Sequence, residues 1–178
     1  MLIAAIILVI TLYSQIFTLA ANRDLLQIHF LDVGQGDAQL ITLPGGAKIL
    51  VDGGLPNKQV LTEITKALGP FGRNIDIIAS THPQLDHFGG LIDIAERYKV
   101  QAFASNGIDR DIPSYQALKD VIADSNLKNI TLQKGDKIKY KKGSACTLVL
   151  STKTYPHSGD QGLPISGLNK LIANSDDN

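Results

Sequence analysis

The chain has 178 residues, a length that fits a single domain, and 44% of them are hydrophobic, as in an ordinary globular protein. The 17 basic and 17 acidic side chains balance to a formal net charge of zero, which counts against a dedicated nucleic-acid-binding module. Cys146 is the single cysteine, which excludes an internal disulfide and a cysteine-built zinc site. Its place in a short apolar run indicates a small core residue in a strand.

The N-terminal segment differs in character from the rest. The first 22 residues carry no charged side chain, and residues 2–21 are about as long as a helix that crosses a bilayer. We expect an uncleaved membrane anchor here, with the remaining chain on the extracytoplasmic side. A signal peptide that leads to secretion is the alternative, and a buried core helix is a third. Arg23 is followed at once by Asp24, so the flanking charges leave the orientation open.

Short apolar runs separated by turn residues predict an α/β domain over residues 23–155, followed by a loop-like or disordered tail at 156–178. The domain opens with a β-meander, for which hairpin-length connections are typical. Strands and helices then alternate. The predicted elements are strands at 27–33, 38–43 and 48–51, a helix capped by Asn57, a strand at 75–79, a helix from about Gly89, a strand at 100–104, a helix after Pro113, and strands at 129–132, 137–140 and 145–150.

A loop with metal-binding residues follows the predicted buried strand. Residues 81–90 are Thr-His-Pro-Gln-Leu-Asp-His-Phe-Gly-Gly. In an extended stretch, residues i and i+2 point the same way, so His82 and Gln84 can share one metal, and the later Asp86 and His87 can serve a neighbouring one. Two such ions can hold the attacking and the leaving oxygen of a hydrolysis. We therefore expect His82, Gln84, Asp86 and His87 as metal ligands, with Asp86 also as a catalytic residue.

Two further motifs precede this loop, Leu-Asp-Val-Gly-Gln-Gly-Asp at 31–37 and Val-Asp-Gly-Gly at 51–54. In order and separation, the three motifs resemble the soluble metallo-β-lactamase-like domain of bacterial ComEC-type competence DNA-uptake proteins, over about residues 27–155. The resemblance implies an αββα sandwich with Zn²⁺ or Mn²⁺ at one edge. It also implies hydrolysis of phosphodiesters in DNA by a metal-bound hydroxide.

Two departures from this family alter the expectation. Gln84 stands where the competence branch usually carries Asp and the wider superfamily His, and a neutral carboxamide is a weaker ligand than a charged one. We therefore expect the first metal site to be weak or empty. In addition, the chain resembles only the first half of the sandwich. The other two histidines are not expected to be ligands, because His29 lies in a predicted strand and His157 in a predicted surface loop. The alternative is therefore a truncated or degenerate, inactive module, or a domain that a second chain completes.

Two sets of supporting residues remain open to more than one interpretation. Asp37 and Asp52 are expected to orient the metal ligands as outer-shell partners, although Asp before Gly is also a common turn former. Asp32 favours a structural role. A group of lysines surrounds the predicted hairpin near residue 140, where it either follows a DNA backbone or protects a sheet edge, and we favour the second. The lysines are Lys134, Lys137, Lys139, Lys141 and Lys142.

Overall fold

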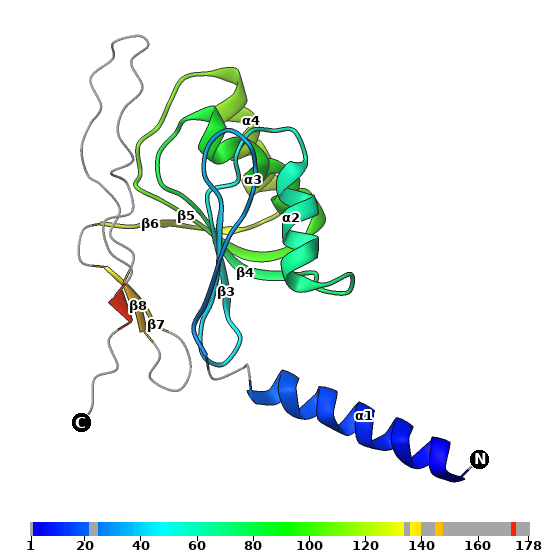
Figure 1. Cartoon of the computed structure of the whole chain (residues 1–178). Helices are drawn as coiled ribbons and strands as arrows, with labels where there is room; N and C mark the ends of the chain where they lie inside the picture. The colour runs from blue at the N-terminus through cyan, green and yellow to red at the C-terminus, as the bar shows by residue number, and fades with distance from the viewer. Residues whose placement is uncertain (1, 22–24, 134–135, 140–144, 148–171, 174–178) are drawn as a thin grey trace, which may run out of the picture.

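A computed structural model describes residues 2–21, 25–133, 136–139, 145–147 and 172–173 (Figure 1). His157, Lys134, Lys141, Lys142 and nearly all of the predicted tail lie outside the described residues. The elements are α1 (Leu2–Ala21), β1 (Gln27–Phe30), β2 (Gln39–Thr42), β3 (Lys48–Val51), α2 (Gln59–Leu68), β4 (Asn74–Ser80), α3 (Leu85–Arg97), β5 (Lys99–Ser105), α4 (Pro113–Asp124), β6 (Lys128–Thr131), β7 (Lys137–Lys139), β8 (Ala145–Thr147) and β9 (Ile172–Ala173).

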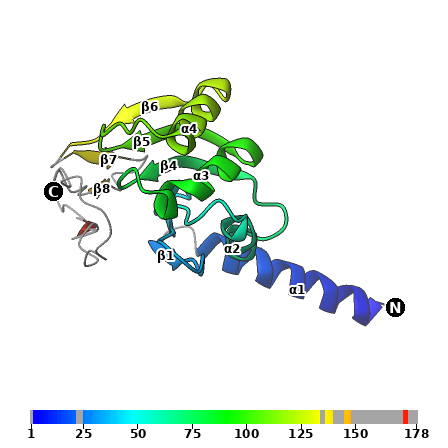
Figure 2. The same cartoon turned by 90° about the horizontal axis from the view of Figure 1, so that it is seen from above.

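The N-terminal helix α1 extends away from the sheet in both views (Figures 1 and 2). In the described part of the chain, no helix combines the length and the apolarity that a membrane crossing requires. The predicted membrane span at residues 2–21 is therefore not supported by the structure.

The main sheet has six strands in the order β1-β2-β3-β4-β5-β6. The first three strands pair antiparallel, as the predicted meander requires. From β3 onward the pairing is parallel, because α2, α3 and α4 carry the chain back across one face between successive strands. The ends of β3, β4 and β5 consequently meet at one edge of the sheet, which is where loops with functional residues are expected in such sheets.

Each face of the main sheet carries its own buried core. On the helical face, Leu50 and Ile78 of the sheet pack with Ile64, Leu91 and Leu118 of the three helices, all fully buried. The opposite face buries a second cluster of sheet residues, and Ile138 of β7 packs against it. A smaller sheet, β7-β8-β9, lies on that side (Figure 1). Strand β7 therefore covers part of the second face. The two layers agree with part of an αββα sandwich.

The predicted start of α3 near Gly89 was wrong. The helix begins at Leu85, with Gln84 in extended conformation before it, and the Phe88 N–H donates to the Gln84 carbonyl at 3.0 Å. The two glycines inside the helix serve close packing instead of a break. A Cβ atom on Gly90 would lie 2.1 Å from the Gly53 carbonyl oxygen. Asp86 and His87 therefore belong to the first turn of a helix that is pressed against the end of β3.

Two smaller predictions need adjustment. Asn57 does not precede the helix directly, since α2 is preceded by Lys58 in a left-handed conformation, but the Asn57 carboxamide oxygen accepts the Gln59 N–H at 2.9 Å. The tail was expected to contain no strand, yet β9 pairs with β8 through Cys146 and Ala173. A strand of two residues is too short to show any periodicity in the sequence.

Candidate metal centre

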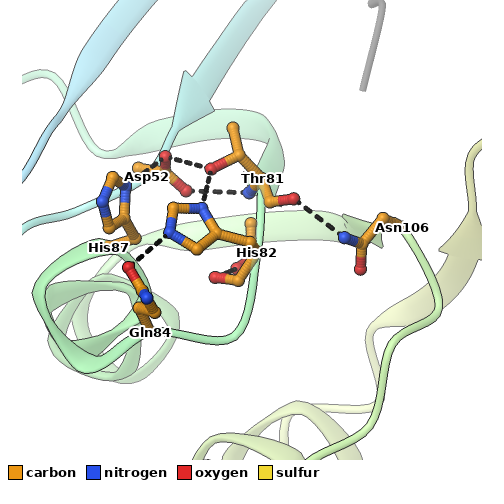
Figure 3. A network of polar contacts seen from close by, with 7 residues as sticks. Asp52, Thr81, His82, Gln84, His87 and Asn106 are labelled. Carbon is orange, nitrogen blue, oxygen red and sulfur yellow. Dashed lines mark hydrogen bonds and ion pairs between the residues drawn. The ribbon is translucent and has the colours of Figure 1, made fainter. Parts of the chain in front are cut away.

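The ends of β3 and β4 bring the functional side chains together (Figure 3). Asp52 directly follows β3, and its N–H donates to the Ala79 carbonyl of β4 at 2.8 Å. Its backbone is left-handed, with a φ of 58°, which is uncommon for a residue with a side chain. Only 3% of Asp52 is exposed. This conformation directs a buried carboxylate toward the loop that follows β4.

Three hydrogen bonds satisfy the Asp52 carboxylate. Oδ1 accepts the Thr81 N–H at 2.8 Å, and Oδ2 accepts the Thr81 hydroxyl at 2.6 Å. Oδ2 also lies 2.9 Å from Nδ1 of His87, which donates there. A histidine that donates one ring N–H to a carboxylate has its other nitrogen oriented for a metal. Asp52 thus makes the contact that an orienting role for His87 requires, with Nε2 left as the nitrogen that can bind a metal.

Thr81 links the same carboxylate to His82. The hydroxyl of Thr81 has one proton, which it donates to Asp52, so its oxygen accepts from Nδ1 of His82 at 2.9 Å. The proton on Nδ1 leaves Nε2 of a neutral His82 with a lone pair. Both histidines are thus held in the tautomer that exposes Nε2, one by Asp52 directly and the other through Thr81. The sequence analysis did not single out Thr81, because a threonine at the end of a strand has no distinguishing signal.

Gln84 contacts the nitrogen of His82 that a metal would use. Oε1 of Gln84 lies 2.8 Å from Nε2 of His82, as the predicted alternation of residues 82 and 84 requires. A bond to Oε1 needs a proton on Nε2, so the neutral ring described above makes this contact only when the carboxamide is turned to present its NH₂ group. In either case, Gln84 must release His82 before the ring can bind a metal through Nε2.

The two histidines respond differently to their surroundings. Burial lowers the pKa of His82, and the neighbouring His87 lowers it further. Burial also acts to lower the pKa of His87, but the hydrogen bond and charge of Asp52, with the charges of Asp86 and Asp37, outweigh it and raise that pKa above its ordinary value. The ring centroids lie only 4.0 Å apart, so two imidazolium charges would repel each other strongly. The arrangement favours a neutral His82.

Donor atoms of Asp52, His82 and His87 lie within 4.8 Å of one another. Two imidazole nitrogens and a carboxylate oxygen form a donor set that suits Zn²⁺ and related transition metals. The described residues therefore fit one divalent ion. The Asp52 oxygens already accept hydrogen bonds from Thr81 and His87, so Asp52 would bind the ion directly only by giving up one of these bonds.

The carboxylate of Asp86 is not part of that group. It lies in the first turn of α3, and its Oδ2 is 3.5 Å from Nε2 of Gln35. The turn at 34–36 packs tightly here, since a Cβ atom on Gly36 would lie 1.6 Å from the Asp86 carbonyl oxygen. Asp37 is exposed and contributes its carbonyl oxygen to the Gly54 N–H at 3.0 Å. Asp86 as a ligand and catalytic residue, and Asp37 as an orienting residue, remain predictions.

A second loop, at residues 106–112 after β5, contacts the metal loop at two backbone carbonyls. The Asn106 carboxamide donates to the Thr81 carbonyl at 3.0 Å (Figure 3). The Arg110 guanidinium donates to the Pro83 carbonyl at 3.3 Å. His82 lies between these two points. The sequence analysis missed both residues, because nothing in a single sequence indicates that residues 25–27 positions apart meet.

The model of the metallo-beta-lactamase superfamily matches residues 31–138, which is more than half of the chain. The chain belongs to this superfamily. The match includes all three motifs and the whole candidate metal centre. No curated protein matches the sequence.

Several solved structures are similar to part of this chain at low sequence identity. A Cronobacter sakazakii metallo-beta-lactamase with a HARLDQ motif is 19% identical, and the match covers 68% of this chain and 46% of that one with a TM-score of 0.48. The metallo-beta-lactamase SMB-1 bound to 2-mercaptoethanesulfonate is 21% identical, with coverages of 68% and 49% and a TM-score of 0.47. A diphosphatase of the PhnP family is 19% identical, with coverages of 64% and 42% and a TM-score of 0.40. The chain spans about half the length of these structures.

Proposed function

We propose that this superfamily member is a metal-dependent hydrolase of the competence type that acts on phosphodiesters in DNA. The observation that carries the proposal is the cluster of Asp52, at the end of β3, with His82 and His87 of the metal loop, whose donor atoms lie within 4.8 Å of one another. The motif at 31–37 supports the competence branch by its resemblance, and its turn packs directly on the first turn of α3 through Gly36. The motif is therefore structurally part of the candidate site.

The chemistry divides between the ion and the protein. A bound divalent ion supplies Lewis acidity and lowers the pKa of a coordinated water towards neutrality. Asp52 holds His87, and Thr81 holds His82, so that the two Nε2 atoms are in place before an ion arrives. Such preorganisation is worth about 10–100-fold in metal affinity.

A metal titration and a hydrolysis assay on the full chain test this proposal. We expect the protein to bind Zn²⁺ or Mn²⁺ at micromolar concentration and to hydrolyse bis(p-nitrophenyl) phosphate and single-stranded DNA, with no turnover of a β-lactam. The variant His87→Ala should lose both metal and activity. The matched control His29→Ala changes a histidine of β1 that lies outside the metal cluster and should retain both. Absence of bound metal in the wild type would exclude the hydrolase.

Gln84 favours a second candidate function, a non-catalytic interaction module. Its neutral carboxamide stands at a ligand position and bonds to Nε2 of His82 at 2.8 Å. If the wild type binds one metal ion tightly but hydrolyses neither phosphodiester substrate, the module is the better description. Partners such as DNA or a second chain would then be sought by binding assays.

A further inference from the structure

An arginine from a neighbouring loop lies beside the metal loop. Arg110, in the loop between β5 and α4, is partly buried, and its Nη1 atom lies 3.3 Å from the Pro83 carbonyl oxygen. Pro83 separates His82 from Gln84, so the guanidinium sits next to the segment that carries both. Among the ion pairs of the described residues, none includes Arg110.

Two carboxylates flank Arg110 in the sequence, those of Asp109 and Asp111. The first of them is held by another cation. Both oxygens of Asp109 accept from Nζ of Lys119, at 2.9 and 3.1 Å. The Lys119 ammonium holds the pKa of Asp109 below its ordinary value through that bond. No ion pair in the described residues joins Arg110 to Asp109 or to Asp111, so the charge of Arg110 is available to a further anion.

The bond to Pro83 does not by itself account for an arginine at this position. At 3.3 Å it is longer than a typical N–H···O bond, and it uses one of five N–H donors. Asn106 already fixes the neighbouring carbonyl of Thr81 at 3.0 Å. The remaining donors of Arg110 form a planar fork, a geometry that matches the oxygens of a phosphate.

Positive charge is otherwise scarce at this site. Asp37, Asp52 and Asp86 surround the histidines and raise the pKa of His87 by their charge. An anionic substrate would be repelled by these carboxylates unless cations offset them. A metal ion offsets part of this charge, and Arg110 is the basic side chain that contacts the metal loop in the described residues.

We propose that Arg110 is an anion-binding residue of this site, which holds phosphate oxygens of the substrate through the guanidinium N–H groups that the Pro83 carbonyl leaves unused. The proposal rests on the proposed function, since it takes the metal loop as the place where a phosphodiester binds. It deepens that function by assigning the substrate's negative charge to a named residue.

The test measures binding of thymidine 5′-monophosphate to the full chain by NMR at low ionic strength. The titration is done once without added metal and once after loading with Zn²⁺. Arg110→Gln should weaken nucleotide binding about tenfold, as the loss of a charge-assisted fork predicts. Arg110→Lys keeps the charge and should recover part of the affinity. The matched control Arg97→Gln removes an equal charge near the end of α3, where Arg97 lies 3.8 Å from Asp93, and should bind like the wild type.

The outcomes separate this proposal from the proposed function. Equal nucleotide affinity in Arg110→Gln and Arg97→Gln, or no nucleotide binding by the wild type, would overturn the role of Arg110. A parallel loss of Zn²⁺ affinity in Arg110→Gln, measured by calorimetry, would also overturn it, because the arginine would then act by supporting the loop. A wild type that binds nucleotide through Arg110 but takes up no metal would refute the hydrolase and leave the anion site standing.

Discussion

The contact between α3 and the end of β3 gives the sharpest structural prediction, Gly90→Ala. Helix propensity alone favours alanine by about 1 kcal/mol. The new Cβ atom, however, would lie 2.1 Å from the Gly53 carbonyl oxygen, whereas ordinary contacts begin at 3.4 Å. Helix and strand end must therefore separate by roughly 1 Å, the difference between these distances, and overpacking of this kind costs about 1–3 kcal/mol.

The separation also strains two hydrogen bonds. The Gly90 N–H donates to the Gly54 carbonyl at 3.0 Å, and the Gly53 N–H donates to the His87 carbonyl at 2.7 Å. Each such bond contributes about 1 kcal/mol net. The steric cost and the two lost bonds outweigh the gain in propensity, so we expect Gly90→Ala to lower the free energy of unfolding by about 2–4 kcal/mol.

Urea denaturation of the full chain, followed by circular dichroism, measures this change. Glu96→Ala in the same helix is the control, because Glu96 is exposed and its replacement should alter stability by less than about 0.5 kcal/mol. Metal affinity should fall in Gly90→Ala as well, since the strained bonds join the residues next to Asp52 and His87. A variant as stable as the wild type would show that the close approach of helix and strand is not required.

Three further substitutions test the metal centre. Asp52→Asn removes the charge that holds His87 and should weaken Zn²⁺ binding by about 10–100-fold in calorimetry; an unchanged affinity would show that Asp52 neither binds nor orients. Thr81→Val removes the hydroxyl between Asp52 and His82, and should weaken Zn²⁺ binding about tenfold and lower stability by about 1 kcal/mol. An unchanged Zn²⁺ affinity in Thr81→Val would contradict the orienting role of Thr81. Gln84→His should raise the Zn²⁺ stoichiometry from one ion to two, and two ions in the wild type at micromolar concentration would contradict the weak first site.

The strands and the metal loop could be predicted because their signals are local. The run of residues 48–51 has the same bounds in prediction and structure, and β4 differs from its predicted range by one residue at each end. The loop is recognisable because its candidate ligands fall within residues 82–87, a span that a single sequence displays directly. The superfamily match over residues 31–138 confirms that assignment at the level of the fold.

The parts that sequence reasoning missed depend on contacts between distant segments. The helix was predicted to begin near Gly89, but both glycines lie inside α3 and let it approach the end of β3. Thr81 lies 29 residues from Asp52, its hydrogen-bonding partner. Arg110 donates a hydrogen bond to the Pro83 carbonyl, which lies 27 residues earlier in the chain. Only the three-dimensional arrangement reveals such pairs.

The hydrogen-bond network also explains how this fold accommodates Gln84. A buried carboxylate destabilises a protein when it lacks partners. Asp52 has three, all supplied by Thr81 and His87, and no buried side-chain polar atom in the described region lacks a hydrogen bond. The network is complete without an ion and does not depend on residue 84, which is exposed. We therefore expect a change of side chain at position 84 to alter metal binding, through the contact with His82, more than stability.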